Sequence, residues 1–190
     1  MITDRPPRRI SHHEEFVRSD EIKDLPLPDN EGLRATAQRI QPAIEGGARG
    51  ELKNACSAFL AAASTFYKVR EPEVSILSVR PLRVREAGWT TELFGDYSPD
   101  RMLIRVWMRT AVLKQVTSFG TFFSTLCHEF CHHLDCHRFG FMRTPHTRGF
   151  YARAAVLYHH ARGTPMRQLI WRRVPGDRWR IDWPAMNRAS

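Results

Sequence analysis

The strongest constraint on the fold comes from residues 121–136, whose apolar and polar side chains separate onto two faces of a helix. At about 100° per residue, one face carries large apolar side chains and cysteine: Phe123, Leu126, Cys127, Phe130 and Leu134. The opposite face carries side chains that can bind metals or protons: His128, Glu129, His132, Asp135 and Cys136. We therefore predict a helix that buries one face in a core and presents the other to a functional site.

The polar face contains the pattern His-Glu-x-x-His at residues 128–132. Residues four apart lie one turn apart on a helix, so the imidazoles of His128 and His132 can bind one zinc ion, with Glu129 beside its open position. Zinc makes a bound water acidic near neutral pH, and a neighbouring carboxylate can carry the proton to the leaving amine. The pattern predicts a zinc-dependent peptidase in which metal-activated water attacks and Glu129 is the general base.

A third protein ligand has to come from outside this motif. The only two carboxylates between residues 100 and 177 lie on the motif helix itself, so a glutamate from a following helix is excluded. His146 lies 14 residues after the second motif histidine, far enough for the chain to turn back to the metal. We predict His146 as the third ligand, and His159 and His160 remain alternatives under the same three-histidine arrangement.

Two segments of the chain together resemble a known family. Residues 128–132 read HEFCH and residues 146–150 read HTRGF. They match the SprT-like (Spartan-type) zinc metallopeptidases, in which His-Glu-x-Cys-His precedes a histidine with phenylalanine four residues later. Cys131 and Phe150 are the matching positions beyond the general zinc motif.

This resemblance implies a zincin-type minimal metallopeptidase fold that binds zinc through His128, His132 and His146, with Glu129 as general base. It also implies an endopeptidase with a protein or peptide substrate. The family includes DNA-dependent proteases that cleave proteins crosslinked to DNA, so DNA is an expected partner.

Two features depart from the family pattern. No cysteine follows Cys136, so the cysteine-rich zinc ribbon of many relatives is missing from this sequence. Thr147 follows the third histidine, where relatives usually have glycine. Both departures concern the substrate and the need for DNA more than the metal site.

Hydrophobic periodicity along the rest of the chain predicts one α+β domain. Helical spacing of apolar residues predicts helices at residues 31–44, 51–67, 117–136 and 144–162. Alternating and β-branched runs predict strands at 74–84, 90–97 and 102–108, and a closing hairpin at 169–174 and 178–183. A turn rich in serine, proline and aspartate at residues 98–101 should join the second and third strands as a hairpin.

The predicted organisation has three parts. Residues 1–30 form a polar N-terminal extension, residues 31–165 form the metallopeptidase domain, and residues 166–190 add a C-terminal β-hairpin to the same domain. Residues 102–109 immediately precede the motif helix, and we expect them to form the sheet edge along which a substrate binds as an extra strand. The alternative is that they form an interior strand.

Charge is distributed unevenly along the chain. The net charge is +9, yet residues 1–100 hold 14 basic and 16 acidic side chains, whereas residues 101–190 hold 15 basic and only 4 acidic ones. A basic C-terminal half favours polyanions such as DNA. In the terminal hairpin Trp171, Trp179 and Trp183 alternate with arginines, which suits either base stacking or packing of the tryptophans on the domain.

An alternative function follows from the same features, a zinc-stabilised basic nucleic-acid-associated binding protein without proteolytic activity. Glu129 distinguishes the two, because a structural zinc site requires no adjacent base. Three of the four cysteines crowd near the motif, which favours a reducing compartment. Residues 1–30 contain no apolar run long enough for a signal peptide or membrane span, and we expect a cytoplasmic protein.

Overall fold

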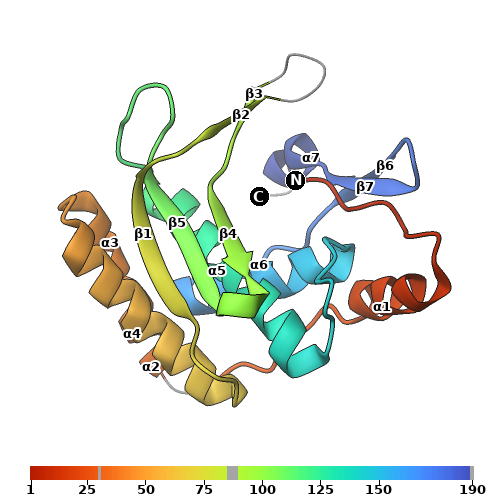
Figure 1. The fold of residues 1–190 in the computed structure, drawn as a ribbon, viewed down its shortest axis with the longest axis horizontal. Helices are drawn as coiled ribbons and strands as arrows, with labels where there is room; N and C mark the ends of the chain where they lie inside the picture. Colours follow the sequence, from red (N-terminus) through yellow and green to blue (C-terminus); the bar gives the residue numbers. More distant parts are fainter. Residues whose placement is uncertain (30, 85–89, 189–190) are drawn as a thin grey trace.

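A computed structural model describes residues 1–29, 31–84 and 90–188. The chain forms a mixed α+β fold in which helices pack against a small three-stranded sheet (Figure 1). Helix α4 (Arg49–Tyr67) packs against strand β1, and helix α5 (Phe119–Leu134) packs against strands β4 and β5. The α+β class predicted from the periodicity is confirmed.

The sheet has the strand order β1-β5-β4. Strand β5 (Leu103–Arg109) lies in the centre, parallel to β1 (Glu73–Val79) and antiparallel to β4 (Gly95–Ser98). A short 3-10 helix, Pro99–Arg101, joins β4 to β5, so the predicted hairpin is confirmed. The expectation that residues 102–109 form the sheet edge is wrong, because β4 takes that place and covers β5 on one side.

The predicted strand at residues 74–84 is broken into two. Strand β1 ends at Val79, and a separate strand β2 (Leu82–Val84) pairs with β3 (Thr90–Glu92). The break coincides with Arg80, whose buried side chain forms an ion pair with Glu92 at 2.9 Å, and with a proline that has no N–H for the ladder.

The helices lie close to the segments where apolar periodicity predicted them, but they begin and end at different residues. Residues 31–44 form two short helices, α2 (Gly32–Gln38) and α3 (Ile40–Glu45). Helix α5 begins after Ser118, whose side chain accepts a hydrogen bond from the Thr121 N–H. It continues into a π-helical turn, Asp135–Phe139, and helix α6 (Arg148–Arg162) packs against it.

The predicted N-terminal extension is folded against the domain. It contains helix α1 (Ile10–Glu21), which packs on α6. The approach is close, because a Cβ atom at Gly149 would lie 2.1 Å from the Ser19 carbonyl oxygen. Ahead of α1, Ile2 forms an antiparallel bridge with Arg180. Neither contact was predicted from the sequence.

The terminal hairpin consists of strands β6 (Trp171–Val174) and β7 (Arg178–Ile181). A short helix that was not predicted, α7 (Trp183–Arg188), follows it. In Figure 1 the hairpin and α7 lie on the same side of the molecule as the N-terminus. Among the described residues no helix has both the length and the apolar character needed to cross a membrane.

Candidate metal centre

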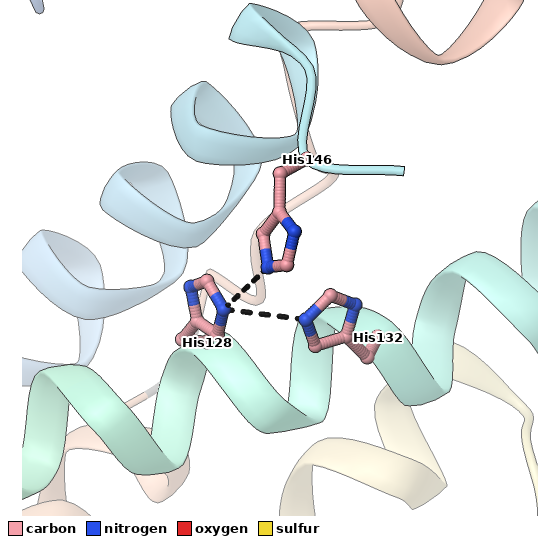
Figure 2. A group of neighbouring side chains, drawn as sticks. All are labelled: His128, His132 and His146. Carbon is pink, nitrogen blue, oxygen red and sulfur yellow. Dashed lines mark hydrogen bonds between the residues drawn. The ribbon is translucent and has the colours of Figure 1, made fainter. Parts of the chain in front are cut away.

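Three histidines point their Nε2 atoms toward one another (Figure 2). The Nε2 atom of His128 lies 3.1 Å from that of His146 and 3.2 Å from that of His132. Nitrogen ligands at about 2.0–2.1 Å in tetrahedral geometry would be about 3.3 Å apart. The cluster therefore has the donor type and nearly the spacing that a tetrahedral metal ion requires, and it could hold one.

Each histidine owes its position to local structure. His128 and His132 lie one turn apart on α5, as the motif spacing predicted. His146 lies in the loop before α6 rather than on a helix, directly ahead of Thr147, whose side chain accepts the Phe150 N–H at 3.0 Å and caps α6. The Phe150 ring packs against all three imidazoles, with centroid separations of 4.4–5.2 Å.

The environment keeps the motif histidines neutral. Burial, followed by the nearby His146, lowers the pKa of His128 to about 3. The pKa of His132 also falls well below its usual value, because of burial first and its two histidine neighbours second. Neutral imidazole is the form that binds a metal ion, so neither ring has to lose a proton near neutral pH.

Glu129 lies in the wall of a cleft of about 770 Å³ that also contains the three histidines. Burial, and to a lesser degree the charge of Asp96, raises the pKa of Glu129 to about 8. Strand β4 comes very close here, since a Cβ atom at Gly95 would lie 2.9 Å from Glu129 Oε1. The carboxyl group is thus confined between α5 and the sheet edge.

His146 is held by Asp4, a residue that no motif in the sequence distinguishes. Asp4 accepts the His146 backbone N–H at 2.9 Å, and its own N–H donates to the His146 carbonyl at 2.9 Å. The same carboxylate lies 3.4 Å from His146 Nδ1. Burial alone would raise the pKa of Asp4, but its hydrogen bonds and charge interaction with His146 outweigh burial and lower it. A carboxylate at Nδ1 favours the tautomer whose Nε2 lone pair faces the cluster.

His132 is oriented from a different direction. Its Nδ1 lies 2.5 Å from Thr144 Oγ1, and that hydroxyl donates to Asp135 Oδ2 at 3.4 Å. Thr144 has φ 39°, a left-handed conformation that costs a β-branched residue about 1–3 kcal/mol. In this backbone conformation the Thr144 hydroxyl lies against the imidazole. Thr144 and Asp135 thus orient the His132 ring, as Asp4 orients that of His146.

The alternative third ligands lie outside the cluster. His159 Nδ1 bonds Thr164 Oγ1 at 2.8 Å, and neither His159 nor His160 belongs to the three-histidine group. His133 and His137 also point away from it, because both bond the Tyr97 hydroxyl, at 2.8 and 3.1 Å. Among the three candidates weighed from sequence, the structure brings only His146 to the motif histidines.

Comparisons with protein-family models, curated proteins and solved structures find no match to this chain. Any function proposed for this chain therefore depends on the motif and on the geometry of the cluster.

The contacts of Asp4 lead to a test of metal affinity. Replacing Asp4 by alanine removes the acceptor that orients His146, and we expect zinc affinity to fall by about 10- to 100-fold. Competition with a chelating dye measures this change. Asp4→Asn keeps an acceptor oxygen and should lose less, whereas replacement of the exposed Asp24 should change nothing. Equal affinities for the parent and Asp4→Ala would contradict the orienting role.

Proposed function

We propose that this chain is a zinc-dependent endopeptidase of the SprT-like type. The observation that carries the proposal is the convergence of His128, His132 and His146 on one point, with Glu129 in the same cleft. Three imidazoles leave a fourth tetrahedral position open, which is the arrangement of catalytic rather than structural zinc sites. The two segments that resemble the family, residues 128–132 and 146–150, contain the three proposed ligands and Phe150.

In this proposal each residue of the cleft has a separate task. Zinc, when bound, supplies a Lewis acid that acidifies water and polarises a peptide carbonyl. Glu129 accepts the proton of the attacking water at its carboxylate and passes it to the departing amine. A cation held by the neighbouring histidines favours the charged form of Glu129, which opposes the effect of burial. Phe150 and the buried face of α5 exclude water from behind the histidines.

Strand β4 gives the substrate a place to bind. It is one of the two edge strands of the three-stranded sheet, and Gly95, Asp96 and Tyr97 line the cleft beside Glu129. An extended peptide could add to such an edge through main-chain hydrogen bonds. This role, expected for residues 102–109, thus passes to the strand that precedes them.

Metal content and proteolysis test the proposal together. We expect about one zinc ion per chain in the purified protein, and much less in the His128→Ala and His146→Ala variants, because each loses a ligand. The zinc-loaded parent should cleave an unfolded protein substrate, with and without DNA, and a chelator should stop cleavage. Replacing the exposed His13 by alanine is the matched control. No metal uptake by the folded parent would remove the peptidase proposal.

One observation favours the alternative of a basic nucleic-acid-associated protein. Arg172 and Arg180 lie directly opposite each other in the β6–β7 ladder, and both are exposed. Like charges at paired strand positions are destabilising, so a polyanion that neutralises them would relieve the repulsion. Two tryptophans of this hairpin already contact other parts of the chain: Arg148 stacks on Trp179, and Trp171 packs beside Tyr151.

Salt dependence tests this surface. If both arginines contact phosphates, the double variant Arg172→Ala/Arg180→Ala should reduce the slope of log affinity against log salt by about 2 for duplex DNA. Fluorescence anisotropy with labelled DNA at several salt concentrations measures the slope. Replacing Arg49 and Lys53 on α4 by alanine removes the same charge from another surface. Equal slopes for both double variants would argue against a site on the hairpin.

A further inference from the structure

A second cavity, of about 560 Å³, opens beside the metal centre. Ser124 and His128 line both this cavity and the cleft that contains Glu129, so the two spaces meet at the first motif histidine. Helix α6 forms one wall through Tyr151, Ala155 and Tyr158, and the C-terminal hairpin and α7 form the other. A side chain of a peptide held in the cleft could therefore enter the cavity at His128.

The lining of the cavity is mostly apolar and aromatic. Leu169, Ile181 and Trp183 face it from the C-terminal segment. Trp183 is 46% exposed, which is costly for a large apolar side chain unless something covers it during function. A ligand with an apolar group of comparable size would bury this surface together with its own.

The carboxylate-free lining described for this cavity contains two arginines. Among the described residues that line it there is no aspartate or glutamate, whereas Arg162 and Arg167 both line it. Arg162 lies at the end away from the metal centre, 3.5 Å from the position a Gly120 Cβ would take. His128 lies eight positions after Gly120 on helix α5. At 1.5 Å per residue the arginine end is about 12 Å from the histidine end. A basic side chain would meet no aspartate or glutamate among the described lining residues, and the cation of Arg162 would repel it.

We propose that this cavity binds a large apolar side chain of the substrate, next to the bond that is cleaved, and rejects lysine and arginine there. The proposal rests on the proposed peptidase function and adds a substrate class to it. The cavity volume, the shared wall at His128 and the lack of aspartate and glutamate in the part of the lining that the structure describes all support the same occupant. The expected substrates are segments with exposed phenylalanine, tyrosine, leucine or methionine, as in partly unfolded proteins.

Binding of short peptide hydroxamates to the zinc-loaded protein tests this inference without requiring turnover. Three compounds are compared that differ only in the side chain beside the zinc-binding group: benzyl, methyl or aminobutyl. Burial of the phenyl ring should make the benzyl compound bind about 10- to 100-fold more tightly than the methyl compound. The aminobutyl compound should bind no better than the methyl compound. Isothermal titration calorimetry gives the three Kd values.

Ala155→Phe should fill the cavity and remove the preference for benzyl, so that the benzyl and methyl compounds bind with similar Kd values. Ala35→Phe makes the same substitution at an exposed position of α2 and should keep the preference. If Ala155→Phe fails to fold, Trp183→Ala removes a wall and should lower the preference instead. Equal affinity for benzyl and methyl in the parent would overturn the inference. Failure of all three compounds to bind would count against the zinc site itself, so the two failures are distinguishable.

Discussion

Replacing Arg153 by alanine is expected to lower the free energy of unfolding by about 3–5 kcal/mol. Arg153 and Asp135 form an ion pair at 2.7 Å in which the side chains are 1% and 0% exposed. The variant would leave the Asp135 carboxylate buried without its cation. Chemical denaturation followed by circular dichroism measures the loss.

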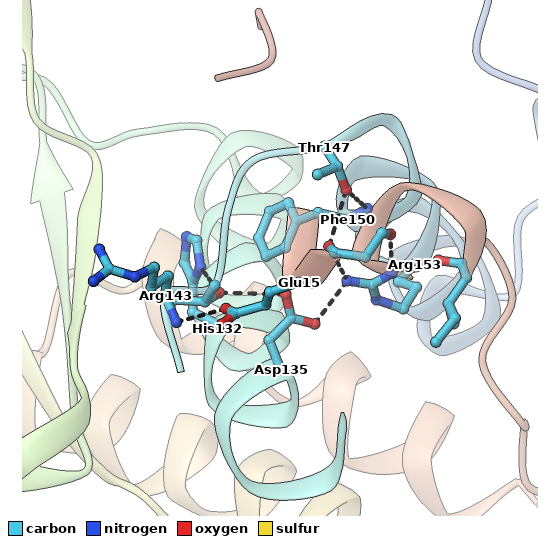
Figure 3. Close-up of polar contacts among 10 residues, drawn as sticks. Glu15, His132, Asp135, Arg143, Thr147, Phe150 and Arg153 are labelled. Atoms are coloured by element: carbon cyan, nitrogen blue, oxygen red, sulfur yellow. Dashed lines mark hydrogen bonds and ion pairs between the residues drawn. The ribbon is translucent and has the colours of Figure 1, made fainter. Parts of the chain in front are cut away.

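Arg153 also joins segments that are far apart in the sequence (Figure 3). Its guanidinium donates to the Ser19 carbonyl at 3.0 Å and to the Ile22 carbonyl at the end of α1, while Phe139 and Phe141 stack near its charge. The Asp135 end of the pair reaches His132 through the Thr144 hydroxyl. Loss of Arg153 should therefore release α1 and weaken zinc binding in the same variant.

Arg148 provides the matched control for this experiment. It pairs with Asp20 of α1 at 2.5 Å, but the two side chains are 34% and 20% exposed. Partly exposed pairs contribute about 0–1 kcal/mol, so Arg148→Ala should have a much smaller effect. The double variant Arg153→Met/Asp135→Leu removes both buried charges and should recover most of the stability. Equal losses for Arg153→Ala and Arg148→Ala would contradict the importance of burial.

Replacing Glu129 by glutamine is expected to reduce peptide hydrolysis by about 10²- to 10⁴-fold, because glutamine cannot accept the proton of the attacking water. The amide has nearly the size of the carboxyl group, so the narrow space beside Gly95 should accommodate it. The three histidines are untouched, and zinc content should stay at the parent value. Initial rates on one unfolded substrate, paired with metal analysis, provide both readouts.

Glu73→Gln, at the exposed start of β1, is the control for Glu129→Gln and should keep full activity. Parent-level cleavage by Glu129→Gln would contradict the general-base role and would favour a different proton acceptor in the cleft. Loss of zinc together with activity would instead show that the substitution disturbed the histidines.

Local patterns predicted the parts of the structure that depend on local spacing. The i, i+4 separation of His128 and His132 fixes their relative position on any α-helix, and the apolar stripe of α5 determines which way they face. The scarcity of carboxylates after residue 100 pointed to a third histidine, and a turn of the chain brings His146 into range. The β4–β5 hairpin followed in the same way from the proline-containing turn.

Features that depend on long-range packing were not predictable. Asp4 is 142 residues from His146 in sequence, and nothing in its local pattern distinguishes it from other acidic residues. Residues 102–109 were expected at the sheet edge because they precede the motif helix in the chain. In the sheet, β1 pairs with β5 although β2, β3 and β4 lie between them in sequence, so β5 is the central strand. Helix α1 has a charged sequence, and its docking depends on Arg153 and Gly149, which lie on a different helix.

The pairing of residues 1–3 with β7 has a consequence for the order in which the site is assembled during synthesis. Thr3 N–H donates to the Trp179 carbonyl, and this bond holds the neighbouring Asp4 beside His146. A ribosome releases the motif helix and His146 before it releases β7. The nascent chain can therefore carry all three histidines while Asp4 still lacks the strand that positions it. Full organisation of the metal centre would wait for the hairpin, so a growing chain would carry an immature centre until β7 has folded.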